Sequence, residues 1–215
     1  MNATIANDLF RQSIRDYHRT DHVDTPIANP YSSSDIESLL YQKNWIDTVQ
    51  WHLEDIIRSP TIRPDELVGI KRRIDQSNQD RTDMVEQIDG WFFEQFRTIT
   101  PKPGARLNSE TPAWLLDRMS ILQLKLYHFR EQTERADAPE EHRRKAQFKL
   151  DVLLEQEQDL AQCFDELMDD IRSGTRYMKV YRQMKMYNDP TLNPVLYGQT
   201  TQEPSSPQPQ AQSQS

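Results

Sequence analysis

Glycine is scarce in this sequence. Only five of the 215 residues are glycine, spread along the chain at Gly69, Gly90, Gly104, Gly174 and Gly198. The P-loop pattern G-x-x-x-x-G-K-[ST] and the dinucleotide-binding pattern G-x-G-x-x-G cannot be assembled from them, and the nucleophile elbow G-x-S-x-G is also missing. The sequence therefore excludes the common nucleotide enzymes that depend on a glycine-rich loop.

Cysteine and long apolar runs are lacking as well. Cys163 is the only cysteine, so the chain can form no internal disulfide and no zinc-finger spacing, which needs a cysteine partner. No apolar run approaches the roughly 18 residues of a membrane span. The N-terminal residues do not combine a cationic start with an apolar stretch, as a signal peptide would. We therefore predict a cytoplasmic protein with no membrane partner.

Positive charge is outnumbered by negative charge. There are 26 Lys and Arg residues against 34 Asp and Glu residues, which gives a net charge of −8. This balance argues against broad electrostatic binding to DNA or RNA, so we expect no nucleic-acid partner. Hydrophobic residues make up 35% and charged residues 28%, a profile typical of long amphipathic helices that each show one apolar stripe to the core.

Proline divides the chain into proline-free stretches. The prolines fall at 26–30, 60–64, 101–112, 139 and from 190 onward. Because a proline ring blocks the preceding helical turn, we expect four long helices between these groups and a shorter helix over 3–18. The long stretches open with residues that favour a helix start: Ser34 with Glu37 as a capping box, Pro64 with Asp65 and Glu66, Thr111 before Pro112, and Asp137 with Glu140.

Apolar residues in these stretches recur at helical spacing, and strand signals are nearly missing. The pattern predicts an all-α fold, an antiparallel helical bundle of about four long helices plus a short N-terminal helix, in a single domain over 1–197. Residues 198–215 are rich in Gln, Ser and Pro and are predicted to form a disordered tail. In the first long helix the predicted core face consists of Leu39, Ile46, Val49, Leu53, Ile56 and Ile57.

Polar residues interrupt the apolar stripes. In the second long helix Asn78 and Arg81 fall on the face of Ile74 and Val85. A buried guanidinium costs several kcal/mol unless it is paired, so Arg81 needs carboxylates or a bound anion opposite it. Similar interruptions occur in the other long helices. In the first, Asp47, Gln50 and Glu54 line one edge of the core face, with Trp45 and His52 on the other edge. The third has Arg118 and Lys125, and the fourth has Glu157.

Two interpretations of these polar residues stay open. The first is an internal network of ion pairs, in which Arg81 pairs with Asp47 or Glu54, and Glu157 pairs with Arg118 or Lys125. The second is a small-ligand pocket between the helices, in which some of these groups face an anion or a sugar.

A basic segment follows the fourth long helix. It holds Arg172, Arg176, Lys179, Arg182 and Lys185, with no acid between Asp170 and Asp189. If this segment is helical, its cations form a stripe that suits a phosphate or an acidic partner. The alternative is that these cations complement a helix C-terminus and pair with nearby acids.

The sequence predicts no metal site. His18 and His22 have the spacing of two ligands on one helix face, but we expect both histidines to be exposed to solvent. A paired-carboxylate magnesium site, as in all-α nucleotide pyrophosphohydrolases, needs acidic motifs that face each other from two helices. Here Asp80, Asp83 and Glu86 point away from the apolar stripe.

Several strings are distinctive: IANPY at 27–31, IESLLYQKNWIDTVQWHLED at 36–55, IDQSNQDRTDMVEQID at 74–89, DRMSILQLKLYHFRE at 117–131 and KVYRQMKMYNDPTLNPVLY at 179–197. Up to about residue 197 the chain resembles the bacterial family called domain of unknown function 4254. The resemblance implies a bacterial helical protein that accompanies cell-envelope glycosyltransferases in glycan assembly. It also singles out polar motif positions as candidate ligand-binding residues: Asn44, Asp47, His52, Glu54, Asn78, Arg81, Asp117, Lys125, Arg182, Asn188 and Asp189.

The basic segment adds Arg176 to these candidates. The residues favour a binding or accessory protein for a phosphorylated or sugar-containing ligand. The family resemblance implies a glycosyltransferase partner in envelope-glycan synthesis as the other target of such a protein. The alternative is an enzyme that acts on a nucleotide or sugar phosphate through the Asp, Glu, His and Arg residues between the helices.

Overall fold

The computed structural model describes residues 1–184, 186 and 189–198, and the chain divides into two units, Met1–Val180 and Tyr181–Ser215. The regular structure of the first unit is helical except for two strands of two residues each, and the described part of the second unit contains one short helix, α6 (Pro194–Tyr197). The predicted all-α fold is confirmed. The elements of the first unit are α1 (Ala3–Tyr17), α2 (Ile36–Ile57), α3 (Pro64–Phe96), β1 (Arg106–Leu107), α4 (Pro112–Glu134), α5 (Glu140–Ser173) and β2 (Arg176–Tyr177).

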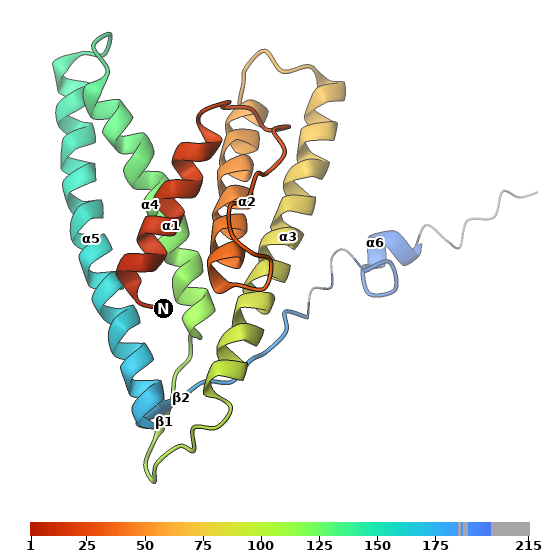
Figure 1. Cartoon of the computed structure of the whole chain (residues 1–215). Helices are drawn as coiled ribbons and strands as arrows, with labels where there is room; N and C mark the ends of the chain where they lie inside the picture. The colour runs from red at the N-terminus through yellow and green to blue at the C-terminus, as the bar shows by residue number, and fades with distance from the viewer. Residues whose placement is uncertain (185, 187–188, 199–215) are drawn as a thin grey trace, which may run out of the picture. The chain divides into compact units, whose positions relative to one another are not determined.

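The long helices form two antiparallel hairpins, α2 with α3 and α4 with α5, and α1 packs against α2 and α4 (Figure 1). One apolar core joins the helices, and Phe10, Phe92 and Phe164 are fully buried in it. A smaller cluster, made of Tyr17, Tyr41 and Trp45, fills the space between α1 and α2. The predicted bundle of four long helices and a short N-terminal helix is therefore confirmed.

Two of the predicted helix starts are found in the structure. Helix α3 begins at Pro64, where a missing N–H costs no intrahelical bond. Thr111 is the N-cap of α4, and its hydroxyl accepts a hydrogen bond from the Trp114 N–H at 3.3 Å. This bond satisfies one of the amide groups that the first turn of a helix leaves without a partner.

The other two predicted starts are wrong. Ser34 does not cap α2, because its hydroxyl donates to the carboxylate of Asp35, which holds the N-cap position. Asp137 does not cap α5, because its carboxylate pairs with Arg135 at 2.7 Å and the helix begins at Glu140 after Pro139. In both places the side chain that was expected to cap the helix interacts instead with a neighbouring side chain outside the helix, Ser34 with Asp35 and Asp137 with Arg135.

Helix α2 buries a different face from the one predicted. Of the predicted apolar face only Leu53 is fully buried, and Ile56 is 40% exposed. The observed buried face instead runs through apolar Ile36, Leu40, Tyr41 and Trp45 and polar Lys43, Asn44, Asp47 and Thr48. The prediction failed because it assigned the interior to apolar residues, whereas polar residues with partners occupy the middle of this face.

The end of α5 decides the shape of the basic segment. Gly174 has a φ of 73°, in the left-handed region, and an added Cβ there would lie 3.0 Å from the Thr100 carbonyl oxygen. The helix stops at this glycine, and β2 then pairs in parallel with β1, Arg106 opposite Arg176. The helical continuation considered for the basic segment is therefore wrong for residues 174–184, which follow the end of α5.

Two further findings concern the ends and surface of the chain. No helix within the described residues combines the length and apolar character that crossing a membrane requires. The predicted tail at 198–215 lies outside the described residues, apart from Gly198. The single-domain boundary at residue 197 stays a prediction.

Candidate functional site

Two cations and two carboxylates meet where α2, α3 and α4 come together. Lys43 and Asp47 of α2 are almost fully buried and paired with each other. The Lys43 Nζ also lies 2.6 Å from the Asp117 Oδ1 of α4. Arg81 of α3 completes the four-residue network, with its Nε 2.7 Å from the Asp47 Oδ1 and a terminal nitrogen 3.0 Å from the Asp117 Oδ1. The formal charges cancel, as burial of such groups requires.

Neutral side chains fix the orientation of the network. Asn44, which is fully buried, donates a hydrogen bond from its amide nitrogen to the Ser120 hydroxyl at 2.9 Å. That hydroxyl donates in turn to the Asp47 Oδ2 at 2.6 Å. Since Asp47 therefore receives contacts from α2, α3 and α4, the network ties the three helices to one register.

The charged forms of Asp117 and Arg81 are stabilised by their partners in the network. Burial alone would favour the neutral form of Asp117, but the neighbouring Lys43 and Arg81 outweigh it and bring the pKa of this carboxyl below its usual value. Burial likewise acts against the charge of Arg81, and the two carboxylates reverse that effect and raise the pKa of its guanidinium. A carboxylate stabilised in this way is a poor proton donor or acceptor near neutral pH.

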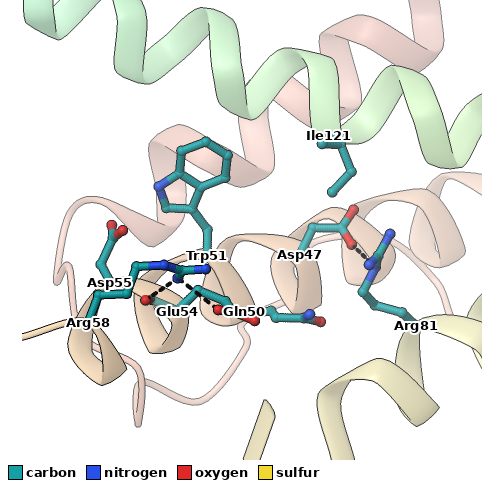
Figure 2. A pocket seen from close by; sticks show the side chains of 8 residues that line it. All are labelled: Asp47, Gln50, Trp51, Glu54, Asp55, Arg58, Arg81 and Ile121. Atoms are coloured by element: carbon teal, nitrogen blue, oxygen red, sulfur yellow. Dashed lines mark hydrogen bonds and ion pairs between the residues drawn. The ribbon is translucent and has the colours of Figure 1, made fainter. Parts of the chain in front are cut away.

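One side of the network opens into a cavity of about 350 Å³. Arg81 is 25% exposed and reaches into it, and Figure 2 shows Arg81 paired with Asp47 at one end of the cavity. Trp51 and Ile121 supply its apolar walls. The complete lining is Asp47, Gln50, Trp51, Glu54, Asp55, Arg58, Arg81 and Ile121.

The opposite end of the cavity is also polar. Glu54 pairs with Arg58 at 2.7 Å (Figure 2). Gln50 is held against α3 from both ends of its amide, because its nitrogen donates to Asn78 at 2.9 Å and its oxygen accepts from Ser77 at 3.1 Å. The lining carries three carboxylates, with Asp55, against two guanidinium groups, and both guanidinium groups are already paired.

A family model described as "Protein of unknown function (DUF4254)" matches residues 37–180. The chain belongs to this family. The match confirms the resemblance seen in the sequence, and it includes all four network residues and the whole cavity lining, whereas α1 and residues beyond 180 lie outside it. No curated protein and no solved structure matches the chain.

The structure brings together most of the predicted site residues that lie inside the family match. Asp47, Glu54 and Arg81 line the cavity, and Asp117 belongs to the network. Asn44 donates to Ser120, which in turn donates to Asp47, and Asn78 accepts a hydrogen bond from the lining residue Gln50. Arg81 pairs with Asp47, as the first interpretation predicted. Arg81 also lines a cavity, and the second interpretation, a ligand in that cavity, stays a prediction.

Other predicted pairings are wrong. Glu157 contacts Arg11 at 2.9 Å and Gln123 at 2.6 Å, and does not reach Arg118 or Lys125. Arg118 pairs with Glu110, and Lys125 is exposed. Both cations lie at the edge of the apolar face of α4, so their side chains are exposed to solvent and do not enter the bundle interior.

Arg176 does not join Arg172 in a helical stripe, because it lies in β2. Arg176 is half-buried between Asp170 at 2.9 Å and the Asn108 side-chain oxygen at 2.7 Å. Arg182 is exposed in the second unit, and Asn188 lies outside the described residues. Asp189 accepts hydrogen bonds from the backbone and hydroxyl of Thr191, which accounts for the lowered pKa of its carboxyl.

The histidines differ from the prediction as well. His22 is exposed as expected, but only 10% of the His18 side chain is accessible. His18 lies against His52 of α2 and His128 of α4. Burial lowers the pKa of His52, and its two histidine neighbours act in the same direction against the nearby carboxylate of Asp21. His52 therefore belongs to this histidine group and not to the cavity.

Several residues of the site were missed. Lys43, Ser120, Trp51, Asp55, Arg58 and Ile121 were not among the predicted site residues. A signal for Lys43 exists, because residues 36, 40, 43, 44 and 47 share one helical face. The contributions of Trp51 and Ile121 depend on how α2 faces α4, which no local pattern specifies.

Proposed function

We propose that this protein binds a sugar-containing ligand in the cavity between α2, α3 and α4. The observation that carries the proposal is the composition of the lining, an apolar wall of Trp51 and Ile121 opposite closely spaced carboxylate, amide and guanidinium groups. A sugar presents C–H faces for an aromatic wall and hydroxyl groups that both donate and accept hydrogen bonds.

The balance of charge favours a neutral polyhydroxylated group over a phosphate at this position. Three carboxylates line the cavity, and both arginines already have carboxylate partners. A phosphate would have to separate Arg58 from Glu54, or share Arg81 with Asp47, beside the negative charge of Asp55. Hydroxyl groups can donate to the accessible carboxylates of Glu54 and Asp55 without displacing any ion pair.

A binding or accessory role is better supported than catalysis. The alternative is an enzyme that acts on a nucleotide or sugar phosphate, with the buried cluster as acid and base. A general acid or base works best with a pKa near the working pH, whereas the pKa of Asp117 is displaced in the opposite direction by Lys43 and Arg81. In keeping with the role that the family resemblance implies, we propose that the bound sugar is held for a glycan-building enzyme.

A thermal-shift screen tests the proposal. Free sugars, sugar phosphates, nucleotide sugars and inorganic phosphate are each added to the full chain, and ligands that raise the Tm are followed by calorimetric titration. We expect a response to ligands that share one sugar and no response to inorganic phosphate. A response to inorganic phosphate alone, or to no sugar-containing ligand, would contradict the proposal.

Matched variants locate the binding site. Asp55→Asn and Glu54→Gln remove charge at the accessible end of the cavity and are expected to weaken binding more than tenfold while the fold is retained. Glu155→Gln, at an exposed position of α5, is the control and should bind as the wild type does. If ligand binding were weakened equally in Asp55→Asn, Glu54→Gln and Glu155→Gln, the loss would not be specific to the cavity and the assignment of the binding site would be wrong.

A further inference from the structure

Three histidines from distant parts of the sequence converge beside the smaller aromatic cluster. His18 follows α1, His52 belongs to α2 and His128 to α4. Each offers one ring nitrogen, and these three atoms all lie within 4.8 Å of one another. The side chains are 10%, 21% and 19% exposed, so the group is shielded but open to small solutes.

The hydrogen bonds around the rings leave lone pairs pointing at one another. The His18 Nδ1 lies 2.7 Å from the Ile14 carbonyl oxygen, which can only accept, so this nitrogen carries the proton. The His128 Nδ1 lies 2.9 Å from the Glu131 carboxylate and donates in the same way. In the neutral rings the Nε2 atoms of His18 and His128 are therefore both acceptors.

The cluster cannot satisfy these acceptors by itself. The His52 Nε2 lies 3.4 Å from the His18 Nε2, and a neutral His52 has at most one N–H at that atom. The His128 Nε2 is buried and has no hydrogen-bond partner within the described residues. At least one buried lone pair thus remains without a donor, which is costly in a site made only for packing.

The same arrangement matches a tetrahedral metal ion. With metal–nitrogen bonds of about 2.0–2.1 Å, two ligand nitrogens of a tetrahedral zinc site are roughly 3.4 Å apart. The Nε2 atoms of His18 and His52 are at that separation, 3.4 Å. The backbone carbonyl on His18 and the carboxylate on His128 are the kind of partners that orient metal-binding imidazoles through their second nitrogen.

We propose that His18, His52 and His128 bind a divalent transition metal ion, with zinc as the best-fitting ion, through their Nε2 atoms. Three imidazoles suit zinc in preference to magnesium or calcium, which select oxygen ligands. The fourth position falls to water or to Asp21, whose Oδ1 lies 3.9 Å from the His18 Nε2 and 3.8 Å from the His52 Nε2. Asp21 is the one non-glycine residue with a positive φ in the described chain, at 50°, and this turn brings its carboxylate to the histidines.

The site is separate from the cavity proposed to bind a sugar, although the two are neighbours. Trp51 lines the cavity, and its ring stacks on His128 with the centroids 5.0 Å apart and an interplanar angle of 12°. No ligand of the metal site lines the cavity. Metal binding and sugar binding can therefore be measured, and can fail, independently of each other.

The test is a calorimetric titration of the full chain with Zn²⁺. For this titration the protein is prepared without a polyhistidine tag and is stripped of metal with a chelator. It also carries the Cys163→Ser substitution, because Cys163 is an exposed thiol that could bind Zn²⁺. We expect one ion per chain at micromolar affinity or tighter. Titration with Co²⁺ should give the intense visible absorption of a tetrahedral site. The absence of saturable binding would overturn the proposal.

Variants assign the ligands. His52→Gln and His128→Gln are each expected to weaken Zn²⁺ binding at least 100-fold, and His22→Gln, at an exposed histidine outside the group, should leave it unchanged. Circular dichroism checks that each variant is folded. Should His128→Gln fail to fold, Glu131→Gln serves instead, because Glu131 is half exposed and orients His128. Glu131→Gln should weaken Zn²⁺ binding about 10–100-fold, and an unchanged affinity in this variant would overturn the assignment. A loss of Zn²⁺ affinity in His22→Gln as large as in the ligand variants would also overturn it.

Discussion

Arg81 reaches from α3 to Asp47 on α2, with its Nε 2.7 Å from the Asp47 Oδ1. Through this contact the bundle interior and the cavity share one side chain, because Asp47 is fully buried while Arg81 is 25% exposed and lines the cavity. The ion pair therefore has two consequences. It compensates the charge of a buried carboxylate, and it presents a fixed guanidinium edge to any ligand.

The first prediction concerns Lys43, the most deeply buried cation of the network. Lys43→Met keeps the length of the side chain but leaves Asp47 and Asp117 with Arg81 as their only cation. Removing one partner from a buried ion pair costs about 3–5 kcal/mol, because the remaining charge is buried without compensation. We expect a loss of that size in the free energy of unfolding, measured with urea.

Lys125→Met is the matched control for this experiment. Lys125 is exposed on α4, so the same substitution there should change the free energy of unfolding by less than about 0.5 kcal/mol. If the two variants were equally stable, the network would contribute nothing to the fold.

The second prediction concerns pH and Asp89. This residue of α3 is only 2% exposed, and burial raises the pKa of its carboxyl to about 6 against the hydrogen bond from Thr111. In the unfolded chain the pKa is about 4. Between these values the native state holds a proton that the unfolded state has lost, so stability falls as the pH rises from about 4 to about 6, by up to roughly 3 kcal/mol.

Asp89→Asn removes this titration and keeps the shape of the side chain. We expect the variant to match the wild type near pH 4 and to exceed it in stability at pH 7, as measured by denaturant unfolding across the range. Asp83→Asn, on the exposed face of the same helix, should show no such trend. If the difference in free energy of unfolding between wild type and Asp89→Asn stayed constant with pH, the pKa of Asp89 would be the same in the folded and unfolded chain, and the prediction would be wrong.

Much of the fold, but only part of the site, could be predicted from the sequence. Proline groups and apolar spacing placed every long helix, because helix starts and amphipathic stripes are local properties of the chain. Arg81 and its pairing with Asp47 were also predicted, since a guanidinium on an apolar face requires a partner.

The errors arose where contacts between distant residues decide the outcome. Lys43 shares a helical face with the buried Leu40, but its partner Asp117 lies on a different helix, so the local pattern does not show how a buried lysine is compensated. The three histidines likewise come from three elements, and their meeting follows from tertiary packing alone. Arg176 was assigned to a helical patch because the sequence gives a run of cations, whereas the left-handed turn at Gly174 ends the helix before it.

The third prediction compares two hydroxyl residues near helix starts. Thr111→Ala removes the side-chain cap of α4 and should cost about 1 kcal/mol, with a further loss from its hydrogen bond to Asp89. Ser34→Ala should cost less than about 0.5 kcal/mol, because Ser34 makes no cap bond to α2. Thermal and urea unfolding of both variants at pH 7 measure the difference. If Ser34→Ala lost more stability than Thr111→Ala, Ser34 would cap α2 after all, as the sequence predicted.

The last prediction separates structure from binding at Arg176. Its guanidinium joins Asp170, near the end of α5, to Asn108, just after β1, with contacts of 2.9 and 2.7 Å. Arg176→Gln loses both contacts and should lower the free energy of unfolding by about 1 kcal/mol, a modest value because the pair is only partly shielded from water. Arg172→Gln is the control, since its partner Asp169 is 79% exposed, and it should be neutral within about 0.5 kcal/mol.

Both variants should bind a sugar ligand as the wild type does, because neither residue lines the cavity. If Arg176→Gln instead kept full stability and lost binding, the ligand would contact the β1–β2 end of the bundle, and the cavity beside Arg81 would not be the binding site.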